Sequence, residues 1–378
     1  MHKWIGAGLL VLLLGSALGP PRSAAQSGIT HQVEPFLYHS ALITALAFAP
    51  DGRLFFAERS GDVRLVSAAG ELQAEPVIRF DVDTLGERGL IGLTLDPAYT
   101  ENGYLYAYYT ALDQGEFGYG IQQRLVRFTE DDGMGGEEVL LWELGIPAAA
   151  DKGMHYGGNL RFGPDGLLYL ALGDNSVAAN AQDLTVQPGK IHRFAVEGDQ
   201  LRPAEDNPWP GNSAYAIGLR NPIDLVFDPL SGALFATENG PLCDDEVNRI
   251  EVGANYGWRP RYGEDALCDN ETPGLYPDYT APLVYYTPTV APVGITVYTG
   301  EQLPEFYGNL FFCAWKDGRM RRLVLDEQRQ AVLFQESVDL RATQCTTDVE
   351  MGPDGALYYV SWTASRAGIY RLVGVEAP

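Results

Sequence analysis

The chain has 378 residues, with 50 acidic against 26 basic side chains and a formal net charge of −24. Nucleic acid is a poor partner for such a chain, because its phosphates bind to basic surfaces. The acidic excess is compatible with cation binding, although a solvated acidic surface explains most of these charges more simply.

The first 25 residues have the layout of a secretory signal peptide. A short basic start (1–3) precedes an apolar stretch (6–18), and small residues (23–25) offer a cleavage site before Gln26. The apolar stretch is shorter than the roughly 20 residues of a membrane-spanning helix, which leaves an uncleaved anchor as the alternative. No later segment is long and apolar enough to cross a bilayer. We therefore expect a secreted or periplasmic protein with one mature domain, residues 26–378.

The cysteines predict disulfides. All of them lie in the C-terminal half: Cys243, Cys268, Cys313 and Cys345. An even number in an oxidising compartment predicts two bridges, for which three pairings are possible. We favour Cys243–Cys268 and Cys313–Cys345, because each pair brackets one local unit. The spacing fits no zinc motif, so a structural role is expected.

A hairpin-like unit repeats along the chain. In each copy an apolar strand leads into a turn of Pro, Asp or Gly, and a second strand rich in Leu, Tyr and Phe follows. The copies are FAPDGRLFFAERSGDVRLV (48–66), LDPAYTENGYLYAYYT (95–110), FGPDGLLYLALGD (162–174), FDPLSGALFATENG (227–240), EMGPDGALYYVSW (350–362) and a degenerate PEFYGNLFFCAWKDGRMRRLVL (304–325). Six units over about 350 residues predict an all-β, six-bladed β-propeller of four-stranded antiparallel blades. Two β-sandwiches are the weaker alternative, because no linker divides the repeat.

Histidine is rare, and His155 is the candidate for chemistry. It lies in a Gly-containing loop, DKGMHYGG (151–158), which leads into the inner strand of a blade. Such loops open toward the central channel of a propeller. An imidazole with an ordinary pKa near ~6.5 can act there as a general base, although a lone loop histidine is more often a hydrogen-bonding residue.

Three further segments could contact a ligand. Arg220 and Asn221 precede a proline and could bind a carboxylate or a quinone oxygen, or form a surface salt bridge. Lys316 follows an apolar strand beside Arg319, Arg321 and Arg322, a basic patch that could attract an anion or remain solvated. Gly240 and Pro241 form a turn whose carbonyl oxygens suit calcium, although no EF-hand spacing is present.

Together these segments resemble the soluble sugar dehydrogenases that depend on pyrroloquinoline quinone (PQQ), the glucose/sorbosone dehydrogenase family. The resemblance runs from about Leu46 to Tyr370. Its markers are ERGLIGLTLDPAYTENGYLYAYYT (87–110), HYGGNLRFGPDGLLYLALGD (155–174), AQDLTVQPGKIHRF (181–194), DNPW (206–209), GLRNP (218–222), ENGPLCDDEVNRI (238–250) and NYGW (255–258).

The resemblance implies a role for each candidate. His155 would be the base that takes the proton of the anomeric hydroxyl, and Arg220 and Asn221 would contact the quinone oxygens. The carbonyls of Gly240 and Pro241 would hold a calcium ion, and Lys316 would meet the carboxylates of PQQ. The substrate would be an aldose sugar, with an electron acceptor that the sequence does not identify.

The chain departs from the family at positions expected to contact anions or substrate. Cys345 and Thr347 stand where relatives tend to carry two arginines, Asn159 replaces another arginine, and Glu87-Arg88 stands where glutamine is more common. Two lost guanidinium contacts of ~1.5–3 kcal/mol each predict roughly hundredfold weaker cofactor binding, unless Arg88 or the arginines at 319–322 substitute.

Two other functions compete with a PQQ-dependent sugar dehydrogenase. A cofactor-less extracellular propeller that binds a carbohydrate or a protein is favoured by the missing arginines. A propeller lactonase would need a metal ring of central Asp, Asn or Glu side chains, which the motifs do not assemble. His155, Arg220, Asn221, Gly240 and Pro241 occur together and favour the dehydrogenase.

Overall fold

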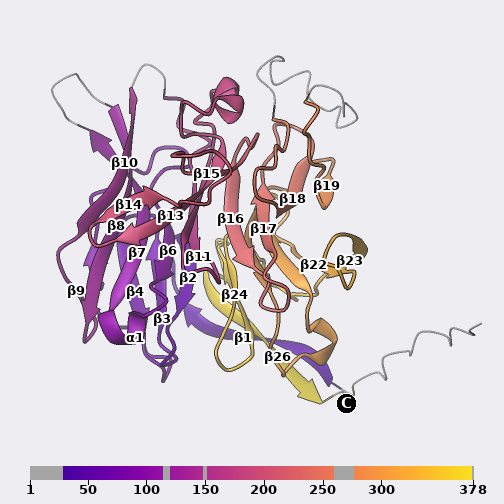
Figure 1. Ribbon diagram of the computed structural model, residues 1–378. Helices are drawn as coiled ribbons and strands as arrows, with labels where there is room; N and C mark the ends of the chain where they lie inside the picture. The colour runs from indigo at the N-terminus through magenta and orange to yellow at the C-terminus, as the bar shows by residue number, and fades with distance from the viewer. Residues whose placement is uncertain (1–28, 114–119, 148–150, 259–275, 377–378) are drawn as a thin grey trace, which may run out of the picture.

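The computed structural model describes residues 29–113, 120–147, 151–258 and 276–376, so the expected signal peptide lies outside it. In the described residues, six antiparallel sheets follow one another along the chain (Figure 1). We call them blades 1 to 6. None of the described helices has the length and hydropathy of a membrane span.

Each blade is built from strands that are close together in the sequence. Blade 1 consists of β2 (Ile43–Phe48), β3 (Leu54–Glu58), β4 (Asp62–Val66) and β5 (Ile78–Arg79). Blade 2 consists of β6 (Leu90–Leu95), β7 (Tyr104–Asp113), β8 (Gly120–Asp131), β9 (Met134–Gly135) and β10 (Val139–Pro147). Blade 3 consists of β11 (Gly157–Phe162), β12 (Leu168–Leu172), β13 (Lys190–Glu197), β14 (Gln200–Pro203) and β15 (Ala214–Ile217).

The second half repeats the pattern. Blade 4 consists of β16 (Pro222–Phe227), β17 (Leu234–Glu238), β18 (Asp245–Ile250) and β19 (Val284–Tyr286). Blade 5 consists of β20 (Pro292–Val297), β21 (Leu310–Ala314), β22 (Met320–Leu325) and β23 (Val332–Ser337). Blade 6 consists of β24 (Val349–Met351), β25 (Leu357–Ser361), β26 (Gly368–Glu376) and β1 (Ile29–Tyr38).

The N-terminal strand closes the ring. β1 pairs with β26 from Ile29 opposite Glu376 to Tyr38 opposite Gly368, and the two strands lie side by side in Figure 1. The first strands of the blades contact one another in the circular order β2, β6, β11, β16, β20, β24 and back to β2. The predicted six-bladed propeller is therefore confirmed. Its one difference from the prediction is a short additional strand in two blades, β9 in blade 2 and β15 in blade 3.

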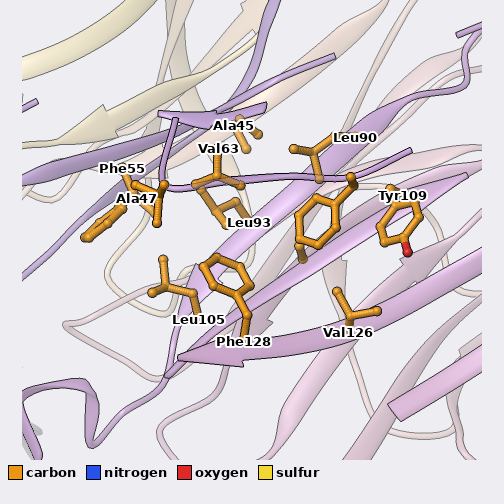
Figure 2. Close-up of a cluster of buried hydrophobic side chains, with 14 of the residues drawn as sticks. Ala45, Ala47, Phe55, Val63, Leu90, Leu93, Leu105, Tyr109, Val126 and Phe128 are labelled. Atoms are coloured by element: carbon orange, nitrogen blue, oxygen red, sulfur yellow. The ribbon is translucent and has the colours of Figure 1, made fainter. Parts of the chain in front are cut away.

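A hydrophobic cluster separates each blade from the next. Phe55, Val63, Leu93 and Phe128 belong to the cluster between blades 1 and 2 (Figure 2). Phe56, next in sequence to Phe55, points the other way into the cluster between blades 6 and 1. Successive side chains of a strand face opposite sides, so both faces of a blade are covered. The second strands of blades 1, 3, 4, 5 and 6 are buried along their whole length. This explains why the second strands read as continuous apolar runs.

The two ends of the propeller differ in what they carry. In every blade the first strand starts from one end and the second strand returns to it, because the two strands are antiparallel. We call this the upper end. The hairpin turns lie at the other end, where Gly166 has a φ of +75° and Asp165 Oδ1 accepts the N–H of Leu167 at 3.1 Å, as the repeat predicts.

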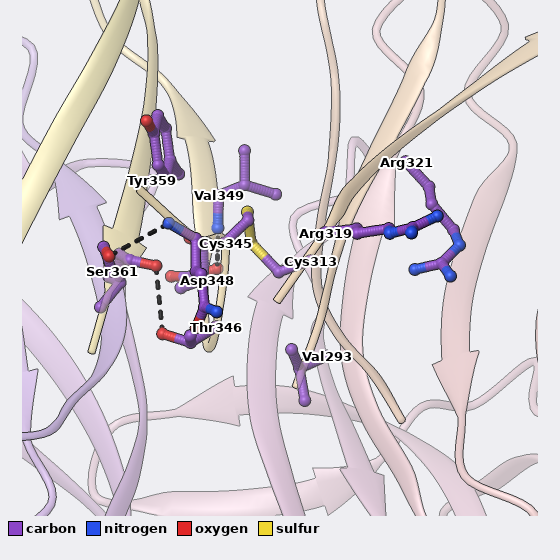
Figure 3. Close-up of a disulfide and its surroundings, with 12 residues drawn as sticks. Val293, Cys313, Arg319, Arg321, Cys345, Thr346, Asp348, Val349, Tyr359 and Ser361 are labelled. Carbon is purple, nitrogen blue, oxygen red and sulfur yellow. Dashed lines mark hydrogen bonds between the residues drawn. A yellow bond between two sulfur atoms is a disulfide. The ribbon is translucent and has the colours of Figure 1, made fainter. Parts of the chain in front are cut away.

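One of the favoured disulfides is confirmed. Cys313, on β21, bonds to Cys345, which precedes β24, with 4.8 Å between the Cα atoms (Figure 3). Both side chains are fully buried, so the bridge ties blade 5 to blade 6 within their shared core. The other favoured pairing involves Cys268, which lies outside the described residues.

Candidate active site

The predicted site residues occupy equivalent places in neighbouring blades. Each lies just before a first strand or just after a second strand, at the upper end: His155 before β11, Arg220 and Asn221 before β16, Gly240 and Pro241 after β17, and Lys316 after β21. The pairing of β16 with β17 supports this placement. Pro222 pairs with Glu238, so the next positions outward bring Arg220 opposite Gly240.

His155 is held by a buried carboxylate. Its side chain is 6% exposed, and Nδ1 lies 2.7 Å from Oδ1 of Asp174, the second residue after β12. Asp174 also accepts the N–H of Ser176 and, on Oδ2, the Nε1–H of Trp258, each at 2.7 Å. A carboxylate at Nδ1 fixes the proton there and leaves Nε2 as the acceptor. Nε2 makes no hydrogen bond to any described residue, so it is available to a ligand.

Glu87 brings His155 and Asn221 together. Its Oε2 accepts the backbone N–H of His155 at 2.7 Å and the Nδ2–H of Asn221 at 3.2 Å. The Oδ1 of Asn221 accepts the N–H of Gly157 at 3.1 Å. His155 itself has a φ of +64°, a left-handed conformation that is costly for a side chain with a Cβ. These bonds hold it there.

Arg220 is fixed along one edge of its guanidinium. Nη1 donates to the carbonyls of Asn239 at 2.8 Å and Gly240 at 3.0 Å, and the guanidinium lies 5.4 Å from the ring centre of Trp258. The Nε–H is buried without a hydrogen-bond partner in the described part of the chain. Beneath it, Glu238 Oε1 accepts the backbone N–H groups of Arg220 and Asn221, each at 2.8 Å, while burial raises the pKa of this carboxyl well above its usual value.

The Gly240 turn is braced by an acid, as its sequence suggests. Asp245 Oδ1 accepts the N–H of Gly240 at 2.9 Å, and Oδ2 accepts the N–H groups of Val290 and Ala291 at 2.5 and 2.6 Å. Burial raises the pKa of Asp245, and these N–H bonds oppose the shift. Asp245 therefore fixes the turn against the next blade, while the carbonyl of Gly240 accepts a hydrogen bond from Arg220.

Several oxygens in this turn lack partners. Glu238 Oε2, Asn239 Oδ1 and Asp244 Oδ2 are buried with no hydrogen-bond donor among the described residues. Buried oxygens are normally satisfied, and hard oxygens are the ligands that calcium takes. No group of three or more His, Cys, Asp or Glu side chains in the described ranges is arranged to hold a metal ion. A cation here would therefore take carbonyl and amide oxygens together with at most two of these carboxylates.

Lys316 lies beside the same turn. Its backbone N–H bonds to the carbonyl of Val290 at 3.1 Å, and its exposed ammonium donates to Thr289 Oγ1 at 2.6 Å. Its charge lowers the pKa of Asp245, against the larger effect of burial. The upper end thus gathers His155, Arg220, Asn221, Gly240 and Lys316 through shared backbone contacts of blades 3, 4 and 5.

The departures from the family pattern have definite places. Cys345 is buried in the disulfide (Figure 3), while Thr347 donates no hydrogen bond within the described residues and its Oγ1 is buried. Asn159 points into the interior, where its Nδ2 bonds to Asp224. None of these three side chains supplies a positive charge to the upper end.

Most of the candidate substitute arginines are engaged elsewhere. Arg88 is 4% exposed and pairs with Asp83 and Asp151, and its Nε donates to Tyr156 at 3.0 Å. In the basic patch, Arg321 bonds Asp317 at 2.6 Å and Arg322 bonds Glu336 at 2.8 Å, while Arg319 lies 3.9 Å from Asp317. Arg88, Arg321 and Arg322 are already paired with acids, so they do not replace the missing contacts. The side chain of Arg319 is 63% exposed and remains available.

Polar side chains do converge on the propeller axis, deeper than the site. Arg161 of blade 3 pairs with Glu350 of blade 6 and lies 3.7 Å from Asp224 of blade 4. Asp348 Oδ2 accepts the N–H of Leu46 of blade 1 at 2.7 Å. Blades 3 and 6 are not neighbours in the ring, so the Arg161–Glu350 pair crosses the axis. A guanidinium occupies the centre of this acidic cluster, where a lactonase metal ring would need a cation.

Three residues of the site are missed by the sequence reasoning: Asp174, Glu238 and Trp258. Asp174 follows the second strand β12 and Glu238 ends the second strand β17, and both are predicted only as parts of motifs. A usable signal was present: Gly157 pairs with Leu172, so extending the register outward sets position 155 opposite position 174. Trp258 has no such signal, because it follows β18 through a loop without regular pairing.

A sequence profile of the glucose/sorbosone dehydrogenase family matches residues 41–371. The chain belongs to this family. It is 28% identical over 328 residues to aldose sugar dehydrogenase YliI of Escherichia coli, a match that covers 84% of this chain and 86% of that protein. The family assignment agrees with the resemblance drawn from the motifs.

Solved structures extend the likeness to the fold. A glucose dehydrogenase from Thermus thermophilus is 33% identical, with a TM-score of 0.75 over 91% of this chain and all of that chain. The PQQ-bound aldose sugar dehydrogenase from Streptomyces coelicolor is 25% identical, with a TM-score of 0.73 over 92% of this chain and 99% of that chain. Relatives in this glucose/sorbosone dehydrogenase family thus include a quinone-loaded enzyme with the same propeller.

Proposed function

We propose that this protein is an exported quinoprotein that oxidises the anomeric carbon of aldose sugars, with PQQ and calcium as cofactors. The observation that carries the proposal is the His155–Asp174 pair, whose free Nε2 lies at the same end as Arg220 and Asn221. The PQQ-bound relative supports the choice of cofactor. The signal-peptide pattern at residues 1–25 supports export.

The residues fit the cofactors. The unpartnered Nε–H of Arg220, the amide of Asn221 and the exposed ammonium of Lys316 offer donors to the oxygens and carboxylates of PQQ. The carbonyls of Gly240 and Pro241 and the unpaired oxygens of their turn offer hard ligands to calcium. PQQ, when bound, supplies the acceptor for the hydride of the sugar C1–H bond.

The chain's own residues manage the proton and the charge. His155 Nε2 takes the proton of the anomeric hydroxyl, and Asp174 stabilises the imidazolium that results. Arg220 and Asn221 place hydrogen-bond donors where negative charge develops. Trp258 covers one face of the Arg220 guanidinium and bonds to Asp174, so it keeps both groups in position.

The second candidate is a propeller that binds a carbohydrate or a protein without a cofactor. It is favoured by the absence of cationic side chains at Cys345, Thr347 and Asn159 and by the prior engagement of Arg88. The comparisons favour the enzyme, because the matched family is that of the glucose/sorbosone dehydrogenases and the sugar dehydrogenase YliI aligns over 84% of this chain, whereas the mouse Hedgehog-interacting protein aligns over 45%.

One titration separates the two candidates. PQQ and calcium are added to the purified protein, binding is followed by absorbance, and sugar-dependent reduction of a dye is then measured for glucose and other aldoses. We expect saturable binding and activity that His155→Ala reduces by roughly a hundredfold or more. The control is His31→Ala, since among the described residues the His31 side chain hydrogen-bonds only to the Asp339 carbonyl. Absence of PQQ binding at micromolar levels, or full activity of His155→Ala, contradicts the proposal.

A further inference from the structure

Two tryptophans stack on each other in the open at the upper end. Trp315 follows β21 of blade 5, and Trp362 follows β25 of blade 6. Their ring centres lie 5.9 Å apart with planes 19° from parallel, and the residues are 44% and 42% exposed. Large aromatic side chains are normally buried, so an adjacent exposed pair indicates a surface that meets a ligand.

The backbones of both tryptophans and the indole ring of Trp362 are held by hydrogen bonds before any ligand arrives. The backbone N–H of Trp315 donates to the carbonyl of Ala291 at 2.8 Å. The backbone N–H of Trp362 donates to Thr346 Oγ1 at 3.0 Å, and its indole N–H donates to the carbonyl of Ser40 at 3.3 Å. A surface whose side chains are already ordered loses little conformational entropy on binding.

The pair has polar neighbours suited to hydroxyl groups. Gln344 and Ser40 are exposed beside the pair. An apolar platform with a few polar groups at its border is the usual make-up of a small-ligand site. A pyranose ring matches it, because one face of the ring presents C–H groups to an aromatic surface while its edge carries hydroxyls.

The position of the pair indicates which ring of a saccharide it would meet. The pair shares the upper end with His155, but His155 belongs to blade 3 and the pair joins blades 5 and 6. Blade 4, with Arg220 and Gly240, lies between them in the ring order. A sugar unit whose anomeric hydroxyl is at His155 therefore does not also fill the platform, and a further unit of the same molecule can.

We propose that Trp315 and Trp362 form a subsite for a second or third pyranose unit, so that the protein accepts oligosaccharides whose reducing end reaches His155. This inference rests on the proposed function for the reducing-end unit. The platform itself requires only that the protein binds a saccharide.

The test uses the full mature chain without PQQ, so that binding is measured apart from catalysis. Maltotriose, cellotriose and glucose are titrated by calorimetry into the wild type, Trp315→Ala and Trp362→Ala. We expect at least one trisaccharide to bind about tenfold more weakly to either variant, with partial recovery in Trp315→Phe and little change for glucose. The matched control is Tyr307→Ala, because Tyr307 is 53% exposed but lies between β20 and β21, at the opposite end.

The PQQ-loaded protein gives the second readout. The ratio of kcat/KM for the trisaccharide to that for glucose should fall about tenfold in both variants. If no sugar is oxidised but trisaccharide binding still depends on the tryptophans, the platform stands and the proposed oxidation falls. Equal trisaccharide binding in all variants, no binding of either trisaccharide, or a parallel fall for glucose and trisaccharide would each overturn the platform.

Discussion

Arg161 and Glu350 form an ion pair across the axis of the propeller, between two blades that are not neighbours. Asp224 and Asp348 complete the cluster and accept backbone N–H groups of Ile295 and Leu46, at 2.8 and 2.7 Å. Five of the six blades thus meet in one network of buried charge. A buried charge that loses its partner destabilises the folded chain. The stability of the closed ring therefore depends on the protonation state of these acids.

The cluster predicts stability that declines as the pH rises. Burial raises the pKa of Glu350 to about 8 and that of Asp348 to about 7, against the opposing charge of Arg161. A carboxyl whose pKa is higher in the folded chain than in the unfolded one binds more protons when folded. Its contribution to stability is therefore complete below the pKa of the unfolded chain, ~4.3 for glutamate. The contribution declines as the pH rises and is lost above about pH 8.

Glu350→Gln checks this dependence. Between pH 5 and pH 9 the variant should lose less of its free energy of unfolding than the wild type, by at least ~1.4 kcal/mol, the equivalent of one pKa unit. Urea denaturation at several pH values measures it. Glu336→Gln is the control. Glu336 lies on the exposed strand β23 and pairs with Arg322 of β22, so its carboxyl is outside the buried cluster. Identical slopes for wild type and Glu350→Gln would contradict the argument.

Asp174→Asn should remove most activity while leaving the fold intact. The asparagine keeps an acceptor for Trp258, but it no longer fixes the proton on His155 Nδ1 or stabilises the imidazolium. We expect kcat to fall by roughly a hundredfold or more, with PQQ binding unchanged. The tautomer of His155, read by nitrogen NMR, should shift toward the Nε2–H form. Asp183→Asn, an exposed acid between β12 and β13, should leave both readouts unaltered.

Thr347→Arg should strengthen PQQ binding. It restores a guanidinium at a position where the family tends to carry one, and Arg88, Arg321 and Arg322 do not replace it. A charge-assisted contact predicts about tenfold tighter binding or more in an absorbance titration. Ala364→Arg adds the same charge at an exposed position of the upper end. An equal gain in both variants would point to general attraction rather than to a contact.

The sequence predicts the propeller because its physics is local and repeated. A few adjacent residues are enough to predict an Asp-Gly turn or an apolar second strand, such as LFFAE and LYYVS. The number of repeats then predicts the number of blades. In the candidate site, the sequence predicts only residues that lie in or directly beside recognisable motifs. Asp174 is found by extending a strand register, whereas the Arg161–Glu350 pair joins residues 189 positions apart and depends on closure of the whole ring.

The same limit applies to the question of substitute arginines. Nothing in the sequence near Arg88 shows that Asp83, Asp151 and Tyr156 enclose it, because two of these three residues belong to a different blade connection. A local basic patch such as 319–322 likewise reads as free charge, although its acids Asp317 and Glu336 pair with it in the folded hairpin. Net local charge therefore overstates what is available to a ligand.

Removing the Cys313–Cys345 bridge should lower the free energy of unfolding without changing the fold. The bridge closes a loop with a sequence separation of 32, for which chain entropy predicts a loss of about 3–4 kcal/mol in the free energy of unfolding. Guanidinium denaturation of the Cys313→Ala/Cys345→Ala variant measures it.

The burial of the bridge gives this prediction its control. Both cysteines are fully buried, so a reducing agent should reach them only when the native chain opens. Dithiothreitol alone should leave the native wild type unchanged, and in denaturant it should lower the stability of the wild type to that of the double variant treated with the same reductant. Because Trp315 and Lys316 directly follow the strand that carries Cys313, the double variant should also bind PQQ and trisaccharide more weakly. Unaltered stability of the double variant would show that the packing of blades 5 and 6 alone holds this edge of the ring.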